Sequence, residues 1–434
     1  MMEPVKTTGW VSPGDPVKRG RRWRPILRPR AGRAIPKELE PENVWRLAAA
    51  LPEGASDPGF GVLLRRIDQA PIVEGNRVEV FFRGEEAFAA MHASIEAARE
   101  QVLVESYIWK DDETGRRFRE VLGRAAARGV AVCVLADAWG SFATRSGFWR
   151  GMRERGIEVR LFHPLFPHLF FQPFRDHRKI LVVDRRVAFT GGMNIADEYG
   201  SSRGGGRGPW RDTHALVEGP AAWEMAIVFS EAWGHAGAAP LELPALEPSA
   251  GGGAAVLVLD SRPGRGHGET ASVLSAIAGA ARRRIWITNA YFAPRRRAIR
   301  ILGEAVRRGV EVRLLLPGRT DVPLVRHAGH GHYAELLGSG VRVFEYQAAV
   351  LHAKTLVVDD LVSLVGSTNL DFRSFHFNAE CNLVILDRGA AGTFAAAFEE
   401  DLSRAVEIRG ASWARRPLLH KIGDALARRL GPLL

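Results

Sequence analysis

The feature that most constrains this chain is a four-residue pattern that occurs twice with the same spacing. In both copies a lysine follows a histidine by two residues, an aspartate follows the lysine by five, and six residues separate the aspartate from a small-residue segment that ends in asparagine. The copies are His177, Lys179, Asp184 and Asn194 in the first half, and His352, Lys354, Asp359 and Asn369 in the second. Such agreement indicates an internal duplication.

Each copy predicts a strand that carries polar groups on one face. Side chains alternate along a strand, so histidine and lysine point the same way, and the apolar residues that follow bury the strand. The small residues of the next segment let the backbone come close to a ligand and aim the asparagine back toward the histidine. They are candidate substrate-binding positions: Gly191, Gly192, Gly366 and Ser367.

Two such faces, brought together, suit a phosphodiester substrate. One imidazole can attack phosphorus and form a phosphohistidine. The other can protonate the leaving alkoxide and later deprotonate the incoming alcohol or water. Lysines and asparagines stabilise charge on the non-bridging oxygens. The motif has no metal-ligand spacing, so we predict neither a metal nor another cofactor.

Carboxylates at matching places are candidates to orient the histidines, because a nucleophilic imidazole needs a partner on its other ring nitrogen. Alignment of the two halves puts Asp212 opposite Glu380, and we predict that Asp212 orients His177 and that Glu380 orients His352. The motif aspartates, Asp184 and Asp359, begin a turn. Carboxylates there often bond local backbone amides, which favours a structural role for them.

The remaining pattern predicts an α/β fold made of two similar domains, each a mostly parallel mixed sheet flanked by helices, packed face to face as a pseudo-dimer. Both halves contain a strand, helix, glycine, strand sequence before the motif. A basic, largely disordered arm is expected over 1–60 and a first domain over 61–233. An Ala/Gly/Pro linker follows at 234–255, then a second domain over 256–409 and an amphipathic basic helix over 410–434.

Composition indicates the partners and the cellular location to expect. The 434 residues carry 60 Lys and Arg against 49 Asp and Glu, a net charge of +11, which either favours polyanionic partners or reflects a general use of arginine. Cys133 and Cys381 lie in apolar runs and are expected to be buried thiols. No run is apolar enough to span a bilayer, and the first residues do not resemble a signal peptide. We therefore expect a cytoplasmic protein, peripheral at the inner face of the membrane.

These residues resemble the phospholipase D superfamily, whose members carry the duplicated His-x-Lys-x4-Asp motif. The phrases around Asn194, Asp212, His352 and Asn369 are closest to bacterial cardiolipin synthases, in a short form without transmembrane helices, and the resemblance covers about residues 75–434. It implies transfer of a phosphatidyl group between phosphatidylglycerol molecules, with His177 as nucleophile and His352 as acid and base. Gly192 stands where the second copy has Ser367, so one hydroxyl donor is lost.

Two segments are candidates for lipid contact. Residues 163–174 are aromatic and interrupted by proline, and form either an entry for acyl chains or a plug between domains. In the last segment Leu418, Ile422, Leu426 and Leu430 recur every four residues among basic side chains, which is typical of an interfacial helix or of one docked on the body. A histidine cluster, His327, His330 and His332, is expected in a polar loop rather than in a metal site.

Alternative functions remain open at this point. A phospholipid hydrolase would use the same residues, with water in place of the alcohol. A nuclease would suit the basic charge, but the apolar segments disfavour it, so nucleic acid is not an expected partner. A membrane-binding scaffold with a dead site is disfavoured because both motifs are complete. The oligomeric state is not predicted.

Overall fold

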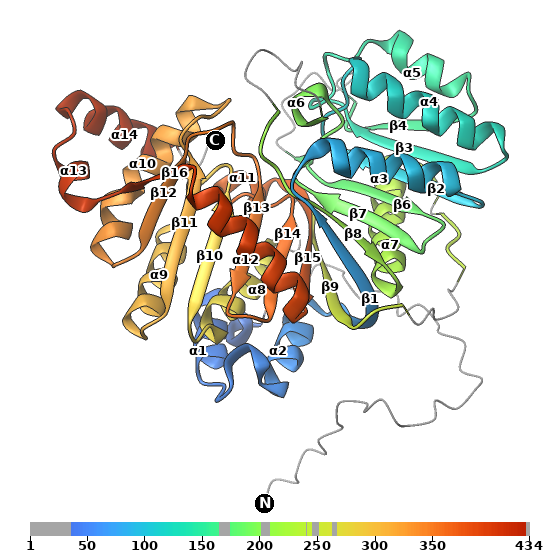
Figure 1. Cartoon of the computed structure of the whole chain (residues 1–434). Helices are drawn as coiled ribbons and strands as arrows, with labels where there is room; N and C mark the ends of the chain where they lie inside the picture. The colour runs from blue at the N-terminus through green and yellow to red at the C-terminus, as the bar shows by residue number, and fades with distance from the viewer. Residues whose placement is uncertain are drawn as a thin grey trace, which may run out of the picture.

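The computed structural model describes residues 36–164, 174–200, 209–239, 241–244, 251–262 and 267–430. Two lobes lie side by side and share one long sheet (Figure 1). Its strand order is β16-β12-β11-β10-β13-β14-β15-β9-β1-β8-β7-β6-β2-β3-β4. The α/β class and the two similar lobes of the sequence prediction are confirmed.

The first lobe contains seven strands of this sheet and five helices. Its strands are β1 Ile72–Phe81, β2 Gln101–Ser106, β3 Ala131–Asp137, β4 Glu158–Phe162, β6 Lys179–Val183, β7 Val187–Gly191 and β8 His214–Glu218. Its helices are α3 Gly84–Ala97, α4 Glu113–Ala127, α5 Ser146–Arg153, α6 Asp197–Gly200 and α7 Pro220–His235.

The second lobe repeats this order and adds an edge strand. Its strands are β9 Ala254–Ser261, β10 Arg284–Asn289, β11 Glu311–Pro317, β12 Arg342–Tyr346, β13 Lys354–Val358, β14 Val362–Gly366, β15 Asn378–Leu386 and β16 Ala405–Ile408. Its helices are α8 His267–Ala280, α9 Arg296–Arg307, α10 Pro323–Gly338, α11 Phe372–His376, α12 Arg388–Leu402, α13 Gly410–Ala414 and α14 Leu418–Leu430. Strands β9 to β15 correspond in neighbour order to β1 to β8 without β5.

The sheet is mixed, and its antiparallel pairs outnumber the parallel ones among the described strands. Parallel pairing among the described strands occurs in β2-β3-β4 and β10-β11-β12, where a helix returns the chain, and between β15 and the two-residue strand β5 (Arg175–Asp176). The motif strands β6 and β13 form hairpins with β7 and β14, and short hairpin turns impose antiparallel pairing. The expectation of a mostly parallel sheet was therefore wrong in this detail.

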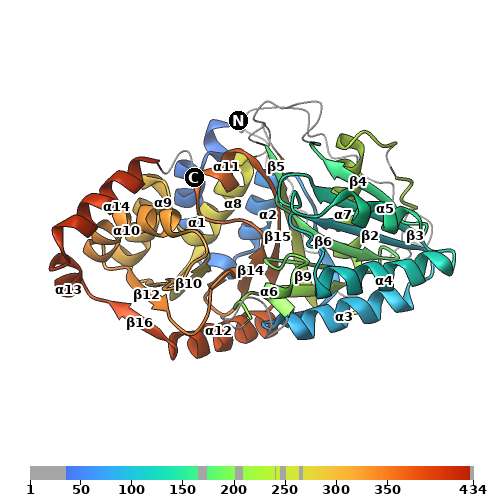
Figure 2. The same ribbon diagram turned by 90° about the horizontal axis from the view of Figure 1, so that it is seen from above.

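The lobes are joined by backbone hydrogen bonding and by a shared core. Strands β1 and β9 pair antiparallel, with Ile72 opposite Leu257. One apolar cluster holds residues of both lobes, among them residues of α7 and α12. A second cluster lies under α3, α4 and α5 in the first lobe, and a third under α8 and α9 in the second. Figure 2 shows α3 and α4 side by side along the first lobe and α12 at the edge of the second. Cys133 and Cys381 are buried free thiols in the shared cluster, as expected.

The expected N-terminal arm is ordered over its last part. Residues 41–49 and 58–68 form helices α1 (Pro41–Ala49) and α2 (Pro58–Asp68), preceded by 3-10 turns at Lys37–Leu39 and Gly54–Ser56. Val44, Ala48, Phe60 and Leu64 are buried in the core of the second lobe against α8. The boundary at residue 60 was wrong because this apolar periodicity was overlooked; residues 1–35 lie outside the described residues.

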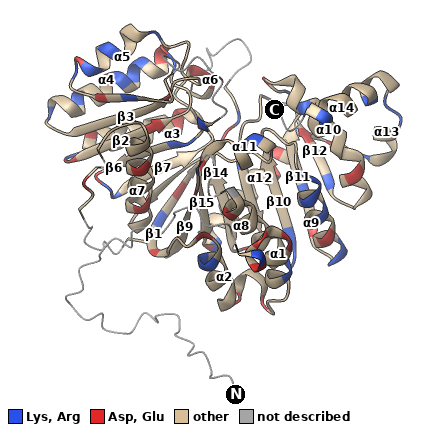
Figure 3. Ribbon diagram, turned by 180° about the vertical axis from the view of Figure 1, so that it is seen from behind, with Lys and Arg blue, Asp and Glu red and all other residues tan. Residues whose placement is uncertain are grey.

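The C-terminal helix α14 packs along α10, and it also exposes its apolar row. Leu418, Ile422, Leu426 and Leu430 are 70%, 48%, 56% and 42% exposed. Within the described residues, no helix is both long and apolar enough to cross a membrane. Lys and Arg of the described residues lie on helices and strands of both lobes (Figure 3).

Candidate active site

Both motif histidines are held by the backbone of the opposite lobe. His177 follows the short strand β5 (Arg175–Asp176), which pairs with β15, and its amide donates to the Ala379 carbonyl at 2.9 Å. The His352 amide donates to the Arg211 carbonyl at 2.8 Å. The loop that carries each histidine therefore crosses to the other lobe, which brings the two motifs to one site.

The carboxylate partners are crossed between the lobes. Glu380 Oε2 lies 2.9 Å from Nδ1 of His177, and Asp212 Oδ2 lies 2.7 Å from Nδ1 of His352. The predicted pairing, Asp212 with His177 and Glu380 with His352, was therefore wrong, although both carboxylates were found. Alignment of the halves identifies equivalent residues, but it does not reveal that each histidine loop enters the opposite lobe.

Burial and mutual repulsion keep the imidazoles neutral. Burial, and then the positive fields of Lys179, Lys354 and His352, lower the pKa of His177 well below its usual value. Burial and Lys354 lower the pKa of His352 against the opposing effect of Asp212. Because groups of the second motif act on His177, the two motifs lie within electrostatic range of each other.

The two carboxylates differ in charge state. Burial raises the pKa of Glu380 to about 7. Burial acts on Asp212 in the same direction, but Lys354, His352 and hydrogen bonds to His352 and Thr213 outweigh it and lower the pKa of Asp212. The pair His352–Asp212 therefore holds a fixed negative charge at neutral pH, whereas Glu380 is poised to share a proton with His177.

Both lysines are fully enclosed beside their histidines. Lys179 donates to the His177 carbonyl at 2.6 Å, and Lys354 Nζ lies 2.8 Å from Nδ1 and 3.1 Å from Nε2 of His352. Burial lowers the pKa of Lys179 to about 7 and that of Lys354 to about 8. Each ammonium also lies over a tyrosine ring, Tyr107 at 5.2 Å and Tyr291 at 6.0 Å.

The two asparagines are placed differently. Asn194 accepts from the Ile108 amide at 3.1 Å and donates to the Tyr199 hydroxyl at 2.8 Å. Asn369 is 3% exposed, and its Oδ1 has no hydrogen-bond partner among the described residues. An unpaired buried amide oxygen costs free energy unless a ligand or water meets it, so Asn369 is available to a bound group.

The small residues serve close packing. A Cβ atom at Gly192 would collide with the Asp212 carboxylate, and one at Gly191 or Gly366 would collide with the neighbouring strand. Ser367 accepts from the Cys381 amide at 3.0 Å and is fully buried. Gly192 thus makes room for the carboxylate that orients His352, and in the described structure the Ser367 hydroxyl is engaged by the sheet.

The motif aspartates anchor the strands that carry the site. Asp184 accepts from the amides of 99–101, at 2.8 to 2.9 Å, and Asp359 from those of 282–284, at 2.8 to 3.0 Å. Each lies beyond the far end of its motif strand, roughly 16 Å from the lysine at 3.3 Å per residue. These contacts agree with the structural role that the sequence favours for Asp184 and Asp359, and not with membership of the catalytic motif as reacting groups.

An aromatic wall around the histidines was missed. Tyr107 packs against His177, with ring centroids 4.9 Å apart, and Tyr199, Trp210 and Tyr291 surround His352 at 5.4 to 5.8 Å. The duplication in the sequence could have identified two of these four residues. Tyr107 and Tyr291 occupy matching places in the duplicated strand segments, directly after β2 and just after β10.

Two other expectations have different outcomes. Residues 165–173 of the aromatic segment lie outside the described residues. The histidine cluster was expected in a polar loop, and this was wrong. It lies in α10, where His327 Nδ1 is 2.8 Å from Asp424 and His330 Nε2 is 2.8 Å from Glu345.

Comparisons with known proteins find similar sequences over most of the chain. A family model described as "Cardiolipin synthase, PLD-like domain" matches residues 91–201 and 273–402. Cardiolipin synthase A of Pseudomonas putida is 38% identical over 375 residues, 85% of this chain and 77% of that protein. Cardiolipin synthase of Geobacillus thermodenitrificans is 34% identical over 381 residues, covering 86% and 75%.

Solved structures show the same fold at low sequence identity. Phosphatidylserine synthase of Haemophilus influenzae superposes with a TM-score of 0.66 at 14% identity, over 85% of this chain and 97% of that chain. Polyphosphate kinase of Porphyromonas gingivalis gives a TM-score of 0.54 at 15% identity, over 85% and 54%.

Proposed function

Because this chain belongs to the cardiolipin synthase family of phospholipase D-like proteins, we propose that it joins two phosphatidylglycerol molecules into cardiolipin and releases glycerol. The observation that carries the proposal is the pair of histidine–carboxylate couples, each built across both lobes, within one buried site. Two couples of this kind supply a nucleophile and an acid–base group for the same phosphorus atom.

In the first step Nε2 of His177 attacks phosphorus. Its Nδ1 faces Glu380, which fixes the tautomer, and no described residue hydrogen-bonds its Nε2. The P–O bond to glycerol breaks, and His352 gives its proton to the departing alkoxide. The negative charge of the bound phosphodiester raises the pKa of His352 above its value in the empty site, so that the proton is held there.

In the second step the roles reverse. The terminal hydroxyl of a second phosphatidylglycerol gives its proton to His352, its oxygen attacks phosphorus, and the P–N bond to His177 breaks. Lys179, Lys354 and the side-chain amide N–H groups of Asn194 and Asn369 stabilise the non-bridging oxygens in both steps. Water in place of the second lipid would yield phosphatidic acid, so exclusion of water decides between synthesis and hydrolysis.

Exposed apolar side chains around the proposed active site favour a lipid as the substrate. Trp139 and Phe142 follow β3 and are 51% and 73% exposed, and Val322 and Leu324 follow the equivalent strand β11 and are 36% and 42% exposed. These loops lie at the strand ends where Tyr107 and Tyr291 meet the histidines. Exposed apolar side chains on both lobes, around one site, are typical of a surface that contacts lipid.

The direct test incubates the purified protein with phosphatidylglycerol vesicles and resolves the products by mass. We expect cardiolipin and glycerol in equal amounts, and loss of activity in both His177→Ala and His352→Ala. If phosphatidic acid formed without cardiolipin, the result would support hydrolysis in place of synthesis. A fully active single histidine variant would contradict a site shared by the two lobes.

A further inference from the structure

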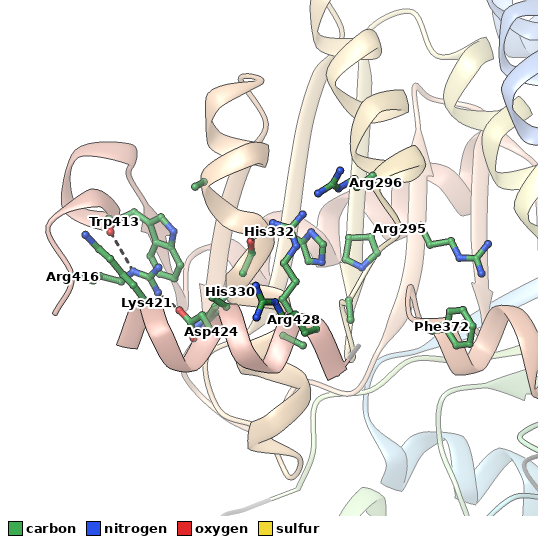
Figure 4. Close-up of a pocket in the computed structure, with 17 residues that line it drawn as sticks. Arg295, Arg296, His330, His332, Phe372, Trp413, Arg416, Lys421, Asp424 and Arg428 are labelled. Carbon is green, nitrogen blue, oxygen red and sulfur yellow. Dashed lines mark hydrogen bonds and ion pairs between the residues drawn. The ribbon is translucent and has the colours of Figure 1, made fainter. Parts of the chain in front are cut away.

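A second basic pocket lies in the second lobe, outside the histidine site. It encloses about 560 Å³ between α14, α10 and the start of α9, and it reaches Phe372 of α11 (Figure 4). Phe372 follows Asn369 by three residues, so one end of the pocket adjoins the loop that carries this motif asparagine. The pocket is thus a neighbour of the proposed active site and is formed by different side chains.

The charges that line this pocket are strongly unbalanced. Among the described residues that line it, Asp424 is the one carboxylate, whereas the cationic residues are Arg295, Arg296, Arg416, Lys421, Arg428 and Arg429. Within the described residues, no ion pair neutralises Arg296 or Arg429. An open pocket with this excess of positive charge is electrostatically complementary to an anion.

A buried and unpaired histidine points to the same ligand class. His332 lines the pocket, is 7% exposed, and its Nδ1 has no hydrogen-bond partner among the described residues. Burial, followed by the fields of Arg428 and Arg296, lowers its pKa to about 4. A phosphate group between these residues would supply both the missing partner and the negative charge.

Asp424 is already engaged in docking α14. Its carboxylate lies 2.6 Å from Arg416 and 2.8 Å from His327, and the side chain is 2% exposed. His327, His330 and Asp424 offer ligand atoms within 4.8 Å of one another, but the Arg416 guanidinium occupies the place of a cation beside Asp424. These groups hold the helix, and Arg296 and Arg428 lie on either side of His332 (Figure 4).

The exposed apolar row of α14 borders the pocket. At 100° per residue, Lys421, Ala425, Arg428 and Arg429 form one strip of the helix, and Leu418, Ile422 and Leu426 form the next. The large exposed apolar residues of the helix are Leu418, Leu419, Ile422, Leu426 and Leu430. Positive charge beside an apolar strip matches a phosphate headgroup beside its acyl chains.

We propose that this pocket binds the phosphate headgroup of an anionic phospholipid in the membrane, with the acyl chains along the apolar row of α14. The bound lipid is not a reactant. It fixes the enzyme on the bilayer with the histidine site beside the surface. The proposal concerns binding alone and does not depend on which reaction the histidine site performs.

The test reverses two pocket charges that have no ion pair. Arg296→Glu with Arg429→Glu is compared with Arg65→Glu with Arg117→Glu, a pair of exposed positions on α2 and α4 with the same change in net charge. Sedimentation with vesicles of phosphatidylglycerol and phosphatidylcholine gives the fraction bound, and phosphatidylcholine vesicles alone give the neutral baseline. We expect the pocket variant to bind about tenfold more weakly than the control pair. Equal binding by the two variants would overturn the proposal.

Two further measurements separate lipid from free phosphate and from misfolding. Turnover of dispersed short-chain phosphatidylglycerol is expected to be unchanged in the pocket variant, which shows that it is folded, while turnover on vesicles falls. Replacement of the apolar row, Ile422→Gln with Leu426→Gln, is expected to weaken vesicle binding as well. If inorganic phosphate at millimolar concentration abolished vesicle binding of the wild type and the apolar replacement had no effect, the pocket would be a phosphate site and the lipid proposal would fail.

Discussion

At the scale of single residues, Glu380 and Asp212 occupy equivalent positions in the two halves of the sequence. Their crossed pairing with the histidines gives them different roles in the proposed reaction. Glu380 acts through the proposed nucleophile His177, and Asp212 through the proposed acid His352. An ester with a good leaving group needs no acid to depart. The two carboxylates can therefore be told apart by the leaving group.

We expect Asp212→Asn and Glu380→Gln each to lower turnover of phosphatidylglycerol by about 10² to 10⁴. With a phosphatidyl ester of 4-nitrophenol, the rapid release of nitrophenolate in the first turnover is expected to recover in Asp212→Asn and to stay slow in Glu380→Gln. Stopped-flow absorbance measures this burst. Recovery in Glu380→Gln alone would support the uncrossed pairing, or an exchange of roles between the histidines.

The lysines predict an alkaline limit for activity. Burial lowers the pKa of Lys179 to about 7 and of Lys354 to about 8, so the free enzyme loses one positive charge and then the other as the pH rises through this range. We expect kcat/KM for dispersed substrate to fall between pH 7 and 9. A bound phosphodiester stabilises the charged lysines, so the limit in kcat lies at higher pH. A kcat/KM that is flat from pH 7 to 9.5 would contradict this.

The duplicated spacing identifies the proposed reacting groups without any knowledge of the fold. It predicts their partners poorly. Asp212 and Glu380 were recognised as equivalent, but the choice of histidine depends on loops that cross between lobes, as the bond from His177 to Ala379 shows. Tyr107 and Tyr291 were visible as repeats, but their role is apparent only once the rings are placed.

At the scale of secondary-structure elements, the motif aspartates make a prediction about stability. Asp359 ties three successive amides at the start of β10 and adopts a φ of 51°. Asp359→Ala removes these bonds and places alanine in a left-handed conformation, and we expect it to lower the free energy of unfolding by roughly 2–4 kcal/mol. Urea denaturation followed by circular dichroism measures this change.

The neighbouring residue provides the control for this experiment. Asp360 is paired with Arg284 at the surface, and Asp360→Ala is expected to cost less than about 1 kcal/mol. Asp359→Asn, which tolerates the conformation and keeps one acceptor, should fall between the two. Equal costs at 359 and 360 would show that the amide bonds contribute little.

The sequence prediction missed helix α10, because glycines in this segment were interpreted as a turn. The histidines of α10 were placed in a loop because Gly329 and Gly331 separate them. In the structure, a Cβ at Gly329 would collide with the Phe292 carbonyl, and Gly331 lies against α14 at Arg428. These glycines allow close packing rather than a turn. Such a contact with a distant segment has no signature in the local sequence.

At the scale of the whole molecule, one buried arginine connects the lobes. Arg178 stands between the first motif histidine and lysine, donates to the Ser261 carbonyl at 2.8 Å, and lies within 3.3 to 3.7 Å of Glu105, Asp176 and Asp260. All of these side chains are buried. The second motif has Ala353 at the same place, so this bridge is made once rather than twice.

We expect Arg178→Met to lower the free energy of unfolding by about 3–5 kcal/mol, because it leaves buried carboxylates without their cation. Arg117→Met, at an exposed position on α4, is the control and should change stability by less than about 0.5 kcal/mol. Burial raises the pKa of Glu105 well above its usual value, so the deficit of the variant should shrink as the pH falls and this carboxyl takes up a proton. Chemical denaturation at pH 5 and pH 8 measures both effects.

The pairing of strands β1 and β9 holds the two lobes in a fixed relative position. A rotation of one lobe against the other would break the hydrogen bonds of a continuous sheet. The gap across which phosphorus sits is therefore set when the chain folds, before any lipid arrives. Lipids with longer or shorter tails have to be accommodated by loops at the rim. Tail length is then expected to alter how fast lipids enter and leave, while the bond-breaking step at phosphorus keeps its rate.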